Sequence, residues 1–226
     1  MKQQCRHSAD PLRSHKPGQW LFSLMSHRLY DFFLYCFVSG FIWRCPPGEL
    51  SAAYREYSAS NHLEIGVGTG YLLHQQSRYR NFERLGLMDL NMACLTKSAQ
   101  RLVLQKPETM QVDITSVMST DGACFDSVAM NFVLHCVPGT FIEKRQALKN
   151  VHRLLNPGGV FFGATLLATG VRHSKTARIL MTILNRLGIF NNNGDALQEL
   201  EHCLKAEFSQ VRTTTLGSAV LWVANK

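Results

Sequence analysis

Short apolar runs alternate along this chain with longer segments in which apolar residues recur every three or four positions. The runs stop at polar or glycine-rich turns, as strands do, and they predict strands over residues 62–65, 84–89, 109–114 and 124–132. The turn at Asn156–Gly159 leads into a fifth such run. Strands that alternate with helical segments are typical of a parallel sheet covered by helices on both faces. We therefore expect an α/β fold in three layers, αβα.

Helical periodicity fills the intervals between these runs. It predicts helices over residues 71–80, 92–105, 140–155, 179–187 and about 195–204. Asn91 is a favourable cap for the second helix, and Asp195 with Gln198 matches a capping box for the last one. Two alternating segments, 208–215 and 218–225, flank Leu216 and Gly217, and they predict a closing antiparallel β-hairpin.

The N-terminal part differs in composition from the rest. Residues 1–18 are polar and basic, lack the apolar core of a signal peptide, and are expected to form a flexible tail. Residues 19–226 are then expected to form one domain, with a helical cap at 19–60 and the core at 61–226.

An aromatic stretch at residues 29–43 lies within this cap. It is too short to span a bilayer, which takes about 20 apolar residues, and it contains Asp31. The prolines at 46 and 47 end the stretch abruptly. We interpret it as a cap helix buried on the core, and the alternative is a surface lid over a lipophilic substrate.

The strongest chemical signal is the stretch from His62 to Leu73, which reads strand, glycine-rich turn and helix start. Glycines at 66, 68 and 70 let the turn close and let a ligand approach the backbone. The amide groups at the helix start suit a carboxylate or phosphate. A dinucleotide-binding turn read from Gly66 requires Gly or Ala where this chain has Tyr71, and the Gly-Lys-Ser/Thr of a P-loop is absent.

Acidic residues end the next two predicted strands. Asp89 lies 19 positions beyond Gly70, and a carboxylate there can accept hydrogen bonds from both hydroxyls of a ribose. Asp113 ends the third run, and the fourth is followed by Val-Leu-His-Cys-Val-Pro at residues 133–138.

These motifs, in this order across residues 62–166, resemble those of class I S-adenosylmethionine (SAM) dependent methyltransferases, in particular the small-molecule group of methyltransferase types 11 and 12. The resemblance implies a Rossmann-like doubly wound sheet, SAM as cofactor and S-adenosylhomocysteine (SAH) as product. It also implies that Asp113 binds the adenine amino group. The cofactor-binding residues expected on this basis are Glu64, Gly66, Gly68, Thr69, Gly70, Asp89, Leu90, Asp113, Ile114, Asn131, Phe132 and His135.

Methyl transfer needs little catalytic machinery, because placement of the acceptor and exclusion of water provide most of the effect. A general base is needed only where the acceptor must lose a proton near neutral pH. His135 is one candidate base, with a loop residue beside the cofactor as the alternative. His173 is a second candidate, with an exposed residue at a helix start as the alternative. Tyr30, Tyr35 and Trp43 are candidate walls of the substrate pocket, with plain core packing as the alternative.

Amino-acid composition and charge bear on the kinds of partner that the chain binds. The 226 residues are 46% hydrophobic and 18% charged, as expected for a globular protein. The net charge of +8 is spread along the chain, so we expect no stable nucleic-acid partner. Seven scattered cysteines without a Cys-x-x-Cys pair favour reduced thiols, a cytoplasmic location and no metal site.

The leading functional hypothesis is a SAM-dependent methyltransferase acting on a small molecule, as a monomer or homodimer without a transmembrane segment. The cap and residues 167–195 are apolar and aromatic, which suggests a lipophilic or aromatic acceptor. The alternatives are an RNA or protein methyltransferase, or a protein that binds SAM without transferring its methyl group.

Overall fold

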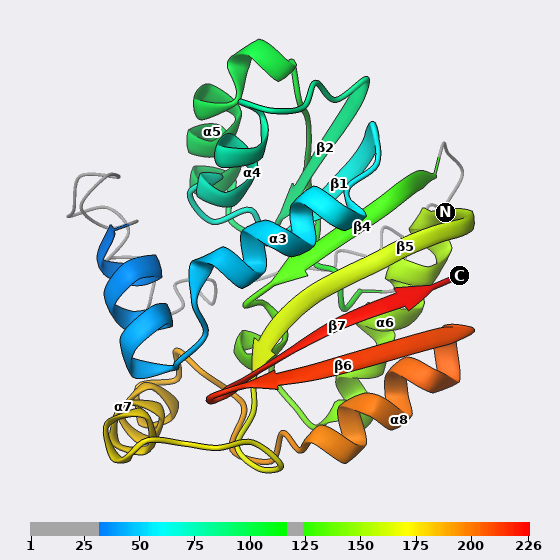
Figure 1. Ribbon diagram of the computed structural model, residues 1–226. Helices are drawn as coiled ribbons and strands as arrows, with labels where there is room; N and C mark the ends of the chain where they lie inside the picture. Colours follow the sequence, from blue (N-terminus) through cyan, green and yellow to red (C-terminus); the bar gives the residue numbers. More distant parts are fainter. Residues whose placement is uncertain (1–31, 117–123) are drawn as a thin grey trace, which may run out of the picture.

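A twisted seven-stranded sheet forms the centre of the molecule (Figure 1). The computed structural model describes residues 32–116 and 124–226, with the backbone alone for 32–36. The strands lie in the order β3-β2-β1-β4-β5-β7-β6. β7 runs antiparallel to β5 and β6, and the other neighbouring strands pair in parallel. Their bounds are β1 Asn61–Ile65, β2 Arg84–Asp89, β3 Glu108–Gln111, β4 Phe125–Asn131, β5 Leu155–Leu166, β6 Gln210–Leu216 and β7 Ala219–Asn225. The predicted doubly wound sheet with a closing antiparallel hairpin is confirmed.

Helices cover both faces of this sheet and form the other two layers. They are η1 Phe32–Ile42, α3 Pro47–Tyr57, α4 Tyr71–Gln76, α5 Met92–Arg101, η2 Val103–Gln105, η3 Leu134–Cys136, α6 Phe141–Leu154, α7 Lys175–Arg186 and α8 Leu197–Glu207. One apolar core joins η1, α3, α4, α5 and α7 to one face of the sheet. A second core joins α6 and α8 to the other face.

Side chains of β1 alternate between these two cores. Leu63 and Ile65 pack into the core beneath α6 and α8. Strand geometry turns His62 and Glu64 to the opposite face, where α3 lies, and both are buried there. A largely buried strand thus holds an acidic residue just before the glycine-rich turn, and this places Glu64 beside the candidate site.

Sequence-based boundaries differ from the structure in two places that matter. The third strand ends at Gln111 rather than at Asp113, because the Asp113 carboxylate accepts the backbone N–H of Thr115 and closes a local turn instead. The expected capping box at Asp195 and Gln198 is wrong. The last helix starts after Ala196, and the Asp195 carboxylate bonds to Lys144 instead.

Other helices agree more closely with the sequence pattern. Asn91 caps α5 as predicted, since its side chain accepts the N–H of Ala93 at 2.9 Å. The helix expected over 92–105 ends at Arg101, and a short 3-10 turn follows it. In the described part of the cap, η1 and α3 are separate helices, and α3 begins at Pro47, where proline favours a helix start. The predicted tail at 1–18 lies outside the described residues.

Candidate functional site

The candidate site lies at the carboxyl end of β1, between β2 on one side and β4 on the other. The chain leaves β1 toward β2 and later returns to β4 on the opposite side, so the strand order reverses at this point. Open α/β sheets bind ligands in the crevice that such a reversal leaves at the carboxyl ends of the strands. The three polar turns that follow β1, β2 and β3 meet here.

Glycine is required in the turn after β1. Gly66, Gly68 and Gly70 all have left-handed backbone angles, with φ of 73°, 53° and 69°. A Cβ added at Gly66 would overlap the side chain of Val133, and one at Gly70 would lie 3.1 Å from the Cβ of Ser98. The turn is therefore packed tightly against its neighbours as well as strained for any other residue.

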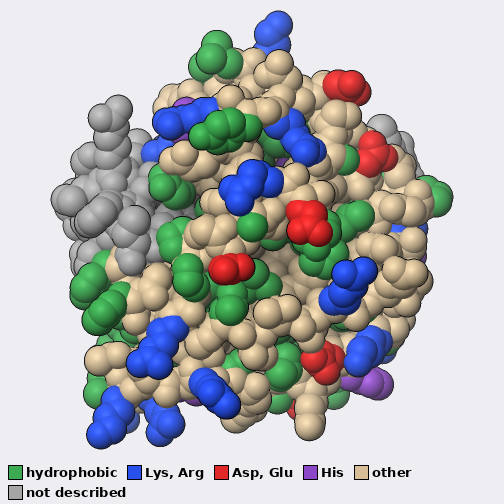
Figure 2. All heavy atoms as spheres, in the orientation of Figure 1, with side chains coloured by type: hydrophobic (Ala, Val, Ile, Leu, Met, Phe, Trp, Pro, Cys, Tyr) green, Lys and Arg blue, Asp and Glu red, His purple; other side chains and the backbone are tan. Residues whose placement is uncertain are grey.

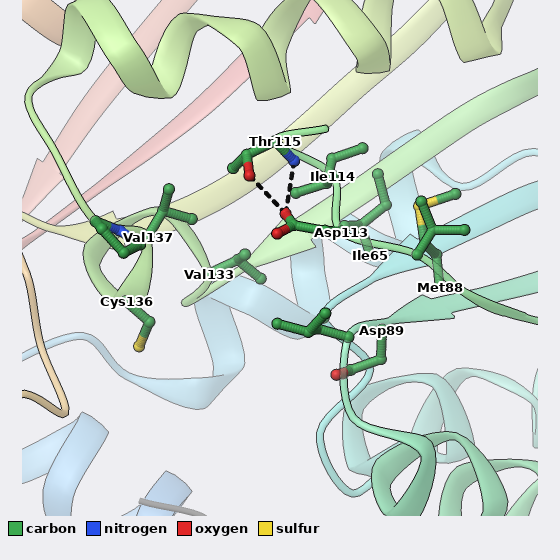
Figure 3. A pocket seen from close by; sticks show the side chains of 13 residues that line it. Ile65, Met88, Asp89, Asp113, Ile114, Thr115, Val133, Cys136 and Val137 are labelled. Atoms are coloured by element: carbon green, nitrogen blue, oxygen red, sulfur yellow. Dashed lines mark hydrogen bonds between the residues drawn. The ribbon is translucent and has the colours of Figure 1, made fainter. Parts of the chain in front are cut away.

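A pocket of about 130 Å³ opens beside this turn (Figure 3). It is lined by Ile65, Gly66, Met88, Asp89, Leu90, Val112, Asp113, Ile114, Thr115, Val133, Cys136, Val137 and Pro138. Two carboxylates, Asp89 and Asp113, follow adjacent strands, and Val133 and Cys136 lie across from them (Figure 3). The pocket thus combines an apolar lining with two acidic groups, a pattern suited to a flat heterocycle that carries hydroxyl and amino donors.

Asp89 lies at the end of β2, and backbone amides surround its carboxylate. The N–H of Asn91 donates to Oδ1 at 2.8 Å, and N–H groups of the glycine turn, at Val67 and Gly68, also face the carboxylate. Burial raises the pKa of Asp89, and these backbone hydrogen bonds oppose the rise. The glycine turn and the end of β2 are therefore tied together through this one side chain.

Asp113 is held by its own turn. Its Oδ1 accepts the backbone N–H of Thr115 at 2.9 Å and the Thr115 hydroxyl at 2.6 Å. Ile114, which follows it, is buried, and its carbonyl accepts from the Asn150 side chain on α6 at 2.6 Å. Both contacts fix the backbone of this turn, so the Asp113 carboxylate has a defined position in the pocket.

A second, smaller hollow adjoins the first at Gly66. It is lined by Glu64, Gly66, Val67, Gly70, Leu72, Leu73 and Asn131. Glu64 is 5% exposed, and burial raises the pKa of its carboxyl, while His62 and Tyr54 oppose that rise. A cationic group placed in this hollow would be stabilised by a carboxylate that water scarcely solvates.

Glu64 belongs to a buried network that the sequence did not reveal. The Tyr54 hydroxyl, on α3, donates to the Glu64 carboxylate and accepts from the Asn131 amide at 3.0 Å. The His62 ring also lies near Glu64. Its Nε2 is 3.6 Å from Glu64 Oε2, and its Nδ1 is 2.7 Å from the Ser127 hydroxyl. Tyr54 carried no motif signal, because it precedes β1 on a separate helix.

Phe132 and His135 lie where the chain leaves β4. Phe132 has a φ of 58°, unusual for a non-glycine residue, and its ring centroid lies 6.0 Å from that of His135. His135 is 3% exposed, and its Nδ1 faces the Thr165 hydroxyl and the Leu166 N–H. Burial, reinforced by the charge of Lys144, lowers the pKa of His135 to about 3, so its ring is neutral.

His173 uses both ring nitrogens within the protein. Its Nε2 lies 2.9 Å from the Ala168 carbonyl and therefore donates to it. Its Nδ1 lies 3.0 Å from the Ser218 hydroxyl. This arrangement ties the start of α7 to the β6–β7 hairpin.

The remaining expected cofactor residues also contact the glycine turn or its surroundings. Gly68 and Thr69 use their carbonyls to accept from Ser98 at 3.1 Å and from Arg101 at 2.8 Å. These contacts anchor the turn to α5. Most of the expected cofactor residues line one or both of the two hollows. The exceptions are Gly68, Thr69, Phe132 and His135.

The three aromatics expected to wall a substrate pocket differ in what the structure describes. Tyr30 lies outside the described residues, and only the backbone of Tyr35 is described, within η1. Trp43 is 4% exposed, and its ring centroid lies 6.1 Å from that of Phe190. Trp43 therefore packs in the core between η1 and the segment after α7.

Metal ligands do not gather in the described part of the chain. Within residues 32–116 and 124–226, no three His, Cys, Asp or Glu side chains are grouped so that they could hold a metal ion.

The amino-acid sequence is similar to those of known methyltransferases. Residues 63–161 match the family described as Methyltransferase domain. Demethylluteothin O-methyltransferase from Streptomyces thioluteus is 36% identical over 196 residues, which cover 87% of this chain and 85% of that protein. Methyltransferase verB from Penicillium polonicum is 31% identical over 224 residues, covering 93% of this chain and 98% of that protein.

Solved structures share the fold. The structure titled PigF with SAH has a TM-score of 0.63 and 19% sequence identity, and the match covers 94% of this chain and 63% of that one. At this level of identity the likeness concerns the fold alone.

Proposed function

The chain belongs to the class I methyltransferase family, and from that premise we propose that it uses SAM to methylate a small lipophilic or aromatic molecule. The observation that carries the proposal is the pair of hollows that meet at Gly66. One presents the carboxylates of Asp89 and Asp113 in an apolar lining, and the other presents the buried carboxylate of Glu64. Together they match the two ends of an amino-acid-bearing nucleoside.

The larger hollow suits adenosine. In the proposed complex Asp89 accepts hydrogen bonds from the ribose hydroxyls, and the Asp113 carboxylate accepts from the adenine amino group. The apolar side chains around them, among them Val133 and Ile114, then cover the faces of the base. Leu90, which is 46% exposed, lies at the rim of the same hollow.

The smaller hollow suits the methionine part. The ammonium group would offset the cost of burying the Glu64 carboxylate, since opposite charges stabilise each other strongly where water is excluded. The carboxylate group would lie near the backbone amides of the glycine turn at the start of α4. Asn131, which lines this hollow, would supply a further polar contact.

Bound SAM supplies an electrophilic methyl group on a sulfonium, so the protein needs to bind, orient and exclude water. In the proposed complex neither candidate histidine acts as a general base. His135 is buried and neutral, and the Nδ1 of His173 faces Ser218. We propose that both histidines position the backbone around the site, with His135 supporting the turn after β4 and His173 fixing the start of α7.

Two features support a small lipophilic acceptor. Two segments outside the nucleotide motifs, η1 with Trp43 after it and the residues after β5, pack through apolar and aromatic side chains, among them Trp43 and Phe190. Asn191 ties the second of these segments to the pocket wall, donating to the carbonyls of His135 and Cys136 at 2.7 and 3.2 Å. The names of relatives, among them Demethylluteothin O-methyltransferase and the Physcion biosynthesis cluster O-methyltransferase, support a small-molecule acceptor.

Transfer of a labelled methyl group tests the proposal. The full chain and methyl-labelled SAM are incubated in three separate reactions, one with a metabolite extract, one with total RNA and one with total protein. We expect label in the organic-soluble small molecules, and much less from an Asp89→Ala variant at the same limiting SAM concentration. Label in RNA or protein instead would contradict the acceptor class. SAM binding by calorimetry without transfer to any fraction would reduce the function to cofactor binding.

A further inference from the structure

Helix α7 has an apolar stripe on its outer side. Its inner side packs into the core through Ala177 and Met181, which are buried. Ile179, Ile183 and Leu187 follow one another at intervals of four residues on the outer side, and they are 62%, 46% and 54% exposed. One side of the helix thus packs against the protein core, and the other side exposes large aliphatic side chains to solvent.

Positive charge surrounds this stripe. Lys175, Arg178 and Arg186 on α7 are exposed, as is Arg172 just before it. The sequence holds no Asp or Glu between Glu143 and Asp195. Figure 2 shows Lys and Arg side chains together with hydrophobic ones at the lower left, over α7. Lys175 stands in the first turn of α7, where the helix dipole disfavours a cation, so helix stability does not account for it.

A second apolar feature adjoins α7. Helix η1 lies next to α7 in Figure 1, and the Ser174 hydroxyl before α7 donates to the carbonyl of Ile42 at the end of η1 at 3.4 Å. Phe37 and Phe41 of η1 are 48% and 73% exposed, and their rings stack at 5.8 Å. The stretch from Phe32 to Gly48 also has no acidic residue.

We propose that the α7 face, meaning Ile179, Ile183 and Leu187 with Lys175, Arg178 and Arg186, binds the surface of a membrane rich in anionic lipid. The aliphatic stripe would enter the boundary between headgroups and acyl chains, while the cationic side chains meet the lipid phosphates. Phe37 and Phe41 would extend the same contact from η1.

Charge and chemistry favour this occupant over others. A nucleic acid would meet the cations, but it offers nothing to three protruding aliphatic side chains. A second copy of this chain would bring the same positive face against itself, which like charges oppose. Within the described residues no helix is long and apolar enough to cross a membrane. The 12 residues of α7 are fewer than the roughly 20 that a transmembrane helix needs, so α7 would lie along the surface.

Vesicle co-sedimentation of the full chain tests the proposal without any need for methyl transfer. Vesicles of phosphatidylcholine alone are compared with vesicles of equal parts phosphatidylcholine and phosphatidylglycerol. We expect binding to the mixed vesicles only. The double variants Ile179→Ser/Ile183→Ser and Arg178→Gln/Arg186→Gln should each weaken that binding by roughly tenfold or more.

A matched control lies on α6. Ile142 is 84% exposed and Lys149 is exposed, and both are far from the α7 face in the sequence and on a helix of the other core. Ile142→Ser/Lys149→Gln removes the same kinds of group and should bind mixed vesicles as the wild type does. Circular dichroism and thermal unfolding verify that every variant is folded.

Four results would overturn the proposal. One is a wild type that does not sediment with mixed vesicles at low salt. Another is an equal loss of binding in the α6 control, which would show attraction by net charge alone. The third is wild-type binding to mixed vesicles by Ile179→Ser/Ile183→Ser, because the stripe would then not be needed for that binding. The fourth is a dimer in solution that this variant abolishes without any vesicle binding, because the stripe would then serve another partner.

Discussion

The Tyr54 hydroxyl lies 2.6 and 2.7 Å from the two carboxylate oxygens of Glu64. It joins a residue of α3 to the last polar position before the glycine turn, and it also accepts from Asn131 on β4. Tyr54 is 1% exposed, and its ring packs edge-on against Phe162 of β5 at 5.2 Å. The helix before β1 thereby positions a carboxylate of the proposed cofactor site, a role distinct from covering the substrate.

Tyr54→Phe tests this link. The change removes the hydroxyl that donates to the buried Glu64 carboxylate, so we expect about 1–3 kcal/mol lower stability and weaker SAM binding. Urea unfolding and calorimetry measure the two effects. Tyr57→Phe, a half-buried residue of the same helix, is the control. Unchanged SAM affinity in Tyr54→Phe would contradict the claim that Tyr54 positions Glu64 for SAM binding.

Asp89→Ala tests the proposed ribose contact. If Asp89 accepts from both hydroxyls, its loss should weaken SAM binding by about 1.5–3 kcal/mol, the range for hydrogen bonds to a charged group. The carboxylate also accepts backbone N–H groups of the glycine turn, so a thermal unfolding curve must accompany the titration. Asp126→Ala, at the opposite end of the sheet, should leave affinity unchanged. A folded Asp89→Ala with wild-type affinity would exclude the contact.

Much of this architecture could be predicted from the sequence, because it depends on local signals. The end of β1 and the turn at Gly66 to Gly70 follow from an apolar run and glycines at backbone angles that other residues avoid. Asp89 at the end of β2 follows from the strand period. Asn91 follows from capping chemistry.

Features that depend on distant contacts could not be predicted in this way. Lys144 looks like a surface residue of an amphipathic helix, but it is fully buried because Asp195, 51 positions later, meets it. The same pairing removed Asp195 from its expected capping role. Tyr54 meets Asn131 across 77 positions. Neither periodicity nor a short motif contains information about such pairs.

His135 provides a test of burial through pH. Its pKa falls from 6.5 to about 3 on folding, so the unfolded chain takes up a proton below pH 6.5 that the folded chain refuses. Stability from this group is therefore complete above pH 6.5 and is lost as the pH falls toward 3, by about 1.4 kcal/mol per unit.

The corresponding measurement is urea unfolding at pH 6.5 and pH 5. Between these values the wild type should lose about 2 kcal/mol more than His135→Asn, whose amide oxygen can replace Nδ1 as acceptor but takes up no proton. His202→Asn, at an exposed histidine, is the control and should follow the wild type. Equal pH dependence in wild type and His135→Asn would mean that the ring is protonated in the folded protein.

The buried pair of Lys144 and Asp195 makes the sharpest prediction about stability. The ammonium Nζ lies 2.7 Å from both carboxylate oxygens, the side chains are 0% and 1% exposed, and Nζ also donates to the Asn191 carbonyl at 2.9 Å. Lys144→Met leaves a buried carboxylate without its cation, which should lower the free energy of unfolding by about 3–5 kcal/mol.

The double variant separates the charge from the packing. In Lys144→Met/Asp195→Leu no unpaired charge remains, and buried ion pairs are often replaced by apolar residues at little cost, so we expect recovery of roughly half the loss or more. The Asp195 backbone keeps its own bonds, since its carbonyl accepts from Ala168 and Thr169. A double variant as unstable as Lys144→Met would show that the pair contributes through the Asn191 contact and local geometry. The isolated buried charge would then not be the cause of the loss.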